Sequence, residues 1–116
     1  MGQYTETISL ADCKVGDRWV GISTIGPVTI NGETPGPNLT RVVLTFRLGQ
    51  STFVLDSDDD EISIDDADTW EASIAAQDEF LNRAGKWAWN MEFWPSGYES
   101  PYTLYEGVLT VHDDVD

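Results

Sequence analysis

The chain has little of what a thiol, metal or nucleophilic site requires. Its 116 residues include one cysteine, Cys13, and one histidine, His112. A single cysteine excludes an internal disulfide and any metal site built from several thiolates. The chain also has no nucleophile elbow and no glycine-rich phosphate loop to accompany its one imidazole. The sequence therefore predicts no enzyme activity and no cofactor.

Basic residues are scarce as well. Six Lys and Arg residues stand against 21 Asp and Glu residues, and the formal net charge is -15. Binding to a phosphate backbone relies on Lys and Arg side chains that displace counterions, so we expect no direct nucleic-acid partner. An acidic inhibitor that presents carboxylates in place of phosphates is one alternative function.

Long apolar runs are absent too. No stretch approaches the roughly 18 to 20 apolar residues of a membrane-spanning helix, so we expect no membrane partner. Hydrophobic residues nevertheless make up 41% of the chain and aromatic residues 11%, which is too apolar for a disordered protein. The length suits one domain over residues 1–116, with residues 1–12 as a candidate N-terminal arm.

What the chain does have is alternation. Apolar side chains recur at every second position near the C-terminus, which is typical of a half-buried strand: Trp87, Trp89, Met91 and Phe93. A second run over 103–111 predicts its antiparallel partner. The same period over 39–48 points Val42, Leu44 and Phe46 inward and Arg41 and Val43 outward.

Shorter alternating segments with turn residues between them recur about every 8 to 12 residues along the chain. Only residues 75–82 have a composition that favours helix, over a length of one or two turns. This pattern predicts an all-β fold, a single antiparallel β-sandwich of about seven strands with one short helical turn.

An acidic run is one candidate site. Asp56, Asp58 and Asp60 have the alternate spacing of a calcium loop. Glu61 stands where such a loop needs glycine, and Ala67 where it needs glutamate, which excludes an EF-hand. The sequence therefore predicts a solvated acidic loop with no metal, and a looser cation site on Asp56, Asp58 and Asp60 is the alternative.

An aromatic hairpin tip is the other candidate. Trp94 falls outside the buried face of its strand and is followed by Tyr98, Tyr102 and two prolines. Exposed aromatic side chains bury a large area on contact at small entropic cost. Trp94, Tyr98 and Tyr102 are therefore predicted to contact a protein partner, with local loop packing as the alternative.

Four short motifs follow one another in order along the chain. They are Gly16-Asp17-x-Trp19, Leu39-Thr40 with Phe46-Arg47-Leu48, Gly85-x-Trp87-x-Trp89-x-Met91, and the run from Thr103 to Val111. This series, from about Val15 to Val115, resembles small immunoglobulin-like β-sandwich proteins encoded in the structural gene clusters of tailed bacteriophages. These are akin to the N-terminal domain of phage baseplate upper proteins.

The resemblance implies an immunoglobulin-like sandwich in a non-enzymatic virion structural protein. Such a protein is expected to be an adaptor or accessory component of the tail, baseplate or neck. It would be made in the host cytoplasm and dock onto other virion proteins in multiple symmetric copies. A capsid decoration (cement) protein is one alternative. A carbohydrate-binding module that stacks sugars on Trp94, Tyr98 and Tyr102 is another.

Overall fold

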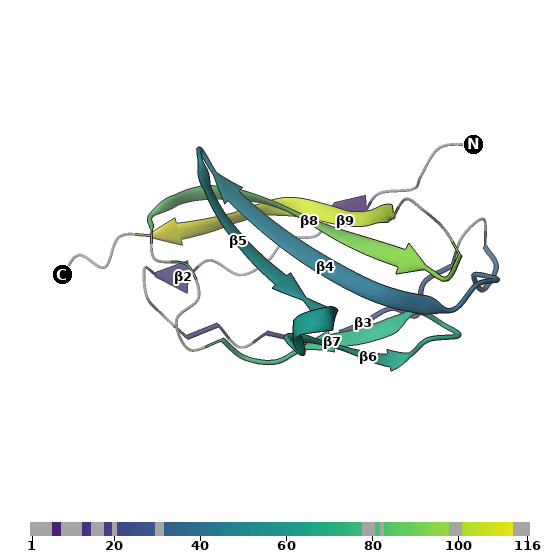
Figure 1. Ribbon diagram of the computed structural model, residues 1–116. Coiled ribbons are helices and arrows are strands. Elements are labelled where there is room, and N and C mark those ends of the chain that lie inside the picture. Colours follow the sequence, from purple (N-terminus) through teal and green to yellow (C-terminus); the bar gives the residue numbers. More distant parts are fainter. Residues whose placement is uncertain are drawn as a thin grey trace.

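The computed structural model describes residues 6–7, 13–14, 18–19, 21–29, 32–77, 81, 83–97 and 101–112. These residues form two facing β-sheets and a single turn of 3-10 helix (Figure 1). Seven strands are four residues long or longer, so the predicted all-β sandwich of antiparallel sheets is confirmed. No helix in this part of the chain is long and apolar enough to span a membrane.

The larger sheet contains four long antiparallel strands. In spatial order they are β9 (Tyr102–His112), β8 (Gly85–Pro95), β4 (Leu39–Leu48) and β5 (Ser51–Asp56). Two short strands, β1 (Glu6–Thr7) and β2 (Cys13–Lys14), pair with β9 in parallel. The part of the candidate N-terminal arm that the structure describes, β1, therefore lies along the chain's own last strand.

The smaller sheet has three strands, and its order is β3 (Ile22–Ile25), β7 (Glu71–Ile74) and β6 (Ile62–Asp66). In immunoglobulin lettering, the strands from β3 to β9 are B, C, C′, D, E, F and G in chain order. The smaller sheet is then BED and the four long strands of the larger sheet are C′CFG. This is the immunoglobulin arrangement. The disulfide that often joins strands B and F cannot form, because the chain has one cysteine.

The core lies between the two sheets, and its aromatic residues come from both. The four side chains predicted to face inward from β8 are all buried: Trp87, Trp89, Met91 and Phe93. From the smaller sheet, Trp70 stacks on Phe93 with a 9° angle between the rings and 6.1 Å between their centroids. Complete burial of one such side chain stabilises the fold by about 2–3 kcal/mol.

The helical turn that the described residues contain lies outside the predicted segment, residues 75–82. It is η1 (Ser57–Asp59), where the chain crosses from β5 to the smaller sheet. Ala75 and Ala76 are not helical, and Gln77 instead forms an antiparallel bridge with Trp19, with two backbone hydrogen bonds of 2.8 Å. Tertiary pairing outweighs helix propensity here. The rest of the predicted helix, apart from Leu81, lies outside the described residues.

Candidate functional site

The structure separates the aromatic residues of the predicted contact site. Trp94 follows the buried Phe93 on β8, so its side chain lies on the outer face of the larger sheet. Tyr102 lies directly opposite Phe93 on β9 and faces inward, where its ring centroid is 6.0 Å from that of Trp70. Tyr98 lies outside the described residues. Trp94 and Tyr102 therefore do not share one platform.

Trp94 is half-buried beside the start of β4. The guanidinium carbon of Arg41 lies 5.9 Å from the centroid of the Trp94 ring, which is within the range of a cation–π contact. Thr40 Oγ1 donates a hydrogen bond of 2.8 Å to the Trp94 carbonyl oxygen. In the described part of the chain, the buried Nε1 of Trp94 has no hydrogen-bond partner. Arg41 thus covers part of the ring that was predicted to be exposed.

Arg41 also organises the acidic run. Its Nε donates to Asp56 Oδ1 at 3.1 Å and its Nη2 donates to Asp56 Oδ2, which is the bidentate geometry that guanidinium and carboxylate favour. Asp58 Oδ2 lies 3.3 Å from the same Nε. The hydrogen bonds from Arg41 hold the pKa of Asp56 below its ordinary value, although partial burial acts in the opposite direction. Asp56 is therefore a charged carboxylate at neutral pH.

The three candidate cation ligands have different local roles. Asp56 accepts the Asp58 backbone N–H at 3.0 Å and so caps η1, in addition to its pairing with Arg41. Asp60 ends that turn in the left-handed conformation, with φ of 63°. No group of three or more His, Cys, Asp or Glu residues in the described ranges is placed to hold a metal ion. The geometry assigns Asp56 a structural role at this corner.

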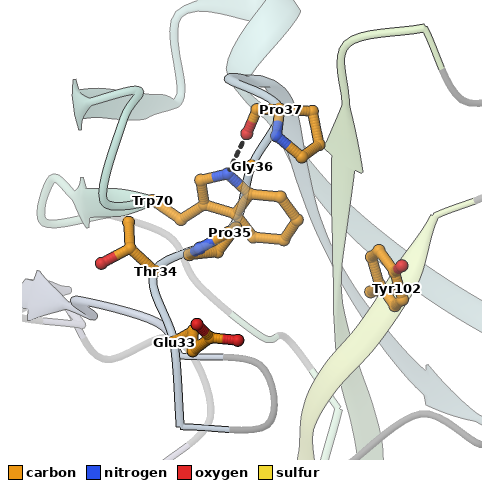
Figure 2. A pocket seen from close by; sticks show the side chains of 7 residues that line it. All are labelled: Glu33, Thr34, Pro35, Gly36, Pro37, Trp70 and Tyr102. Carbon is orange, nitrogen blue, oxygen red and sulfur yellow. Dashed lines mark hydrogen bonds between the residues drawn. The ribbon is translucent and has the colours of Figure 1, made fainter.

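Two surface hollows are lined by described residues. One, of about 200 Å³, lies between the loop at residues 33–37, Trp70 and Tyr102 (Figure 2). Trp70 is fully buried, and its Nε1 donates a 2.8 Å hydrogen bond to the Pro37 carbonyl oxygen. The second hollow, of about 390 Å³, lies beside the smaller sheet and includes Asp60, Glu61 and Ser63 in its lining. None of the described residues that line either hollow is basic.

A further surface was not predicted. Val54 and Val108 are 44% and 53% exposed, and they are the exposed large hydrophobic side chains of the described residues. Strand register places both on the outer side of the larger sheet, in two adjacent rows that cross β5, β4, β8 and β9. We call these eight residues the outer face: Val54, Thr45, Asn90 and Glu106 in one row, and Thr52, Arg47, Ala88 and Val108 in the next.

The outer face is electrically balanced, because Arg47 and Glu106 are its charged members. The acidic residues gather elsewhere: nine of the sixteen residues from 56 to 71 are Asp or Glu, and none is Lys or Arg. A face with no net charge on a chain of net charge -15 is a candidate contact surface, since two copies or partners can approach it without the repulsion that the acidic residues cause.

No family model, curated protein or solved structure matches the chain.

Sequence reasoning missed Arg41 and the outer face for one reason. Both depend on which residues lie opposite each other across the strands, and alternation within one strand does not give that register. A signal was present in the short Gly49-Gln50 turn, because counting outward from it places Val43 opposite Asp56, as the structure shows. Arg41, two residues before Val43, then lies on the same face as Asp56.

Proposed function

We propose that the protein is a non-enzymatic structural component of a tailed phage virion, an adaptor or accessory part of the tail, baseplate or neck. It works by docking onto other virion proteins. The observation that carries this proposal is the outer face, a sheet surface with no net charge and two exposed valines on a strongly acidic chain.

The outer face combines exposed apolar side chains with uncharged polar ones and carries one charge of each sign. Its exposed valines, Val54 and Val108, lie among Thr, Ala and Asn side chains. Two further residues of β8, Glu92 and Trp94, continue the same side of the strand beyond Asn90. Trp94 therefore borders the docking surface, as the predicted contact site requires, whereas Tyr102 lies on the other side of the sheet.

The charge distribution supports the same function. The carboxylates of residues 56–71 keep free copies apart before assembly, because like charges repel and maintain solubility. A balanced docking face avoids that repulsion at the contact itself.

The strand order supports the virion role. A BED sheet facing a C′CFG sheet is the architecture that the resemblance to phage structural proteins implies. Immunoglobulin-like sandwiches also serve many other roles, so the fold alone does not decide between them.

Quantitative mass spectrometry of purified particles of the encoding phage tests this role. We expect the chain at a copy number set by the symmetry of the tail, baseplate or neck. A copy number that follows the capsid lattice would replace the adaptor role with that of a decoration protein. Absence from the particles would overturn the proposal.

A matched pair of variants tests the docking surface. Val108→Lys places a charge in the outer face, and we expect it to lower incorporation into particles with little change in thermal stability. Thr24→Lys adds the same charge at an exposed position of β3 on the other sheet, and should be incorporated like the wild type. Equal incorporation of both variants would exclude the outer face as the contact.

A further inference from the structure

Within the described residues, β5 is the last strand on one side of the larger sheet, and no strand pairs with its outer edge. Among the described residues only β4 pairs with β5, which runs from the Gly49-Gln50 turn to η1 (Figure 1). In a hairpin with a two-residue turn, the residues that flank the turn, Leu48 and Ser51, form a hydrogen-bonded pair. Hydrogen-bonded and non-hydrogen-bonded pairs then alternate along the strands.

This alternation decides which backbone groups point outward. Ser51, Phe53 and Leu55 direct their N–H and C=O groups to β4, while Thr52, Val54 and Asp56 direct theirs away from it. Asp56 confirms the assignment, because its N–H donates to Glu61 Oε1 at 3.1 Å and its carbonyl accepts the Glu61 N–H at 3.2 Å.

Because Asp56 uses its outward groups to bond Glu61, the remaining backbone N–H and C=O groups that point away from β4 belong to Thr52 and Val54. Proteins usually protect such an edge with Lys, Pro, a bulge or an inward-pointing charge. β5 has no Lys or Pro, its pairing with β4 continues without a register shift, and Val54 is 44% exposed. The edge is open to an added strand.

We propose that this edge binds the β5 strand of a second copy of the chain, antiparallel, about a two-fold axis at Phe53. In this register Thr52 lies opposite Val54 of the second copy. Their outward N–H and C=O groups form two hydrogen bonds, and the symmetric pair forms two more. The side chains that face the core in each copy then lie on the same side of the combined sheet. A shift of one residue between the two β5 strands would place Phe53 opposite Val54 and put core-facing and solvent-facing side chains on one side.

The charges at the two ends of β5 favour the antiparallel arrangement. At the first end, Arg47 lies opposite Thr52, and Arg83 Nη1 donates a 2.9 Å hydrogen bond to Ser51 Oγ. At the other end, η1 carries Asp58 and Asp59, with further carboxylates after them. Antiparallel pairing brings the basic end of each copy beside the acidic turn of the other. Opposite charges then meet twice, which offsets part of the repulsion between two chains of net charge -15.

This inference stands on the edge geometry and does not depend on the virion role. A protein that fails to pair through β5 can still dock onto a virion through the outer face, and the two outcomes are measured separately.

Sedimentation velocity of the full chain across a concentration series tests the pairing. We expect wild type to form a species of twice the 12.9 kDa chain mass. Thr52→Pro removes an N–H that points away from β4, so it spares the ladder within the chain. It should weaken the dimer about tenfold or more, because two of the four intermolecular hydrogen bonds are lost. Thr52→Val keeps the N–H and should dimerise like wild type.

Two results would overturn the proposal. The first is a wild-type chain that stays monomeric up to about 1 mM, because a dissociation constant above that value means very weak association. The second is a Thr52→Pro variant that dimerises as well as wild type. A charge exchange keeps the test independent of any effect of proline on folding. Arg83→Glu should weaken the dimer, and adding Asp59→Arg in the same chain should restore it. An unchanged dimer constant in Arg83→Glu would contradict the antiparallel register.

Discussion

Arg41 shows how one residue connects otherwise separate features of this molecule. It pairs with Asp56, lies near Asp58 and covers part of the Trp94 ring. It thereby ties the start of β4 to the acidic corner and to the edge of the predicted contact site. A residue with this many roles is expected to affect stability more than other basic residues of the same sheet.

Replacing Arg41 tests this. Arg41→Ala leaves the carboxylate of Asp56, whose side chain is only 12% exposed, without its charged partner. We expect the free energy of unfolding to fall by about 1–2 kcal/mol, because the guanidinium itself is partly solvated. Urea unfolding at pH 7 measures the loss. Lys86→Ala, at an exposed position of β8, is the matched control and should change stability by less than about 0.5 kcal/mol.

The same pair makes stability depend on pH. The pKa of Asp56 is lower in the folded protein than the ordinary value of about 3.9 in an unfolded chain. Its contribution is therefore complete above about pH 5 and is lost as the pH falls through the folded pKa. We expect wild type to exceed Asp56→Asn in unfolding free energy at pH 7 and the gap to shrink at pH 3. A gap that stays constant would show that the charge of Asp56 contributes nothing.

The tryptophans allow a test of buried hydrogen bonding. Trp70 Nε1 donates to the Pro37 carbonyl, whereas the buried Nε1 of Trp89 has no partner in the described part of the chain. Phenylalanine at either position removes the indole N–H, and the two substitutions remove the same side-chain volume. We expect Trp70→Phe to cost about 1 kcal/mol more than Trp89→Phe, because only the first change leaves a carbonyl without its bond. Equal losses in thermal or urea unfolding would contradict this.

At the scale of single residues, the sequence predicted which side chains are buried better than it predicted which residues contact one another. Strict alternation was sufficient for Trp87 to Phe93, and those predictions are confirmed. Val43 was predicted to face solvent and is buried, 8% exposed, although it lies on the outer side of β4. Asp56 and Glu92 flank it across the neighbouring strands, and Arg41 lies beside it on its own strand. These longer side chains surround the valine, and one-strand periodicity contains no information about them.

At the scale of elements, Gly21 fixes how the chain enters β3. Its φ is +78°, and the Cβ of an alanine there would lie 2.1 Å from the Ile74 carbonyl oxygen on β7. Backbone therefore meets backbone at this point, and the smaller sheet closes only because a side chain is absent.

Alanine substitutions at two glycines test this closure. Gly21→Ala should destabilise the fold by about 2–4 kcal/mol, because neither backbone can move without opening the pairing of β3 with β7. Gly36→Ala is the control, since an added Cβ there meets nothing within 4 Å, and should change stability by less than about 0.5 kcal/mol. Circular dichroism melts of both variants measure the difference. Similar melting temperatures would show that β3 can shift freely.

The elements also show where composition misleads. Residues 75–77 have helix-favouring composition but are not helical, and Gln77 pairs with Trp19 instead. The helical turn forms at Ser57–Asp59, where local capping by Asp56 and the crossing between sheets require it. Both outcomes depend on contacts between distant segments, which composition alone does not give.

At the scale of the whole molecule, the acidic residues and the exposed valines lie on different parts of the surface. The acidic residues gather around η1 and the smaller sheet, while the outer face of the larger sheet is balanced and exposes Val54 and Val108. The two-sheet architecture was predictable, because seven alternating segments bury one face each. The outer face was not predictable, since it is assembled from four strands whose register the sequence does not state.

The most direct test of the proposed role is the copy number of this chain in purified particles, measured by quantitative mass spectrometry with wild type and Val108→Lys side by side. We expect wild type at a number fixed by the symmetry of the tail, baseplate or neck, and the variant well below it at equal expression and equal melting temperature. Absence of the wild-type chain from the particles would contradict a structural role in the virion.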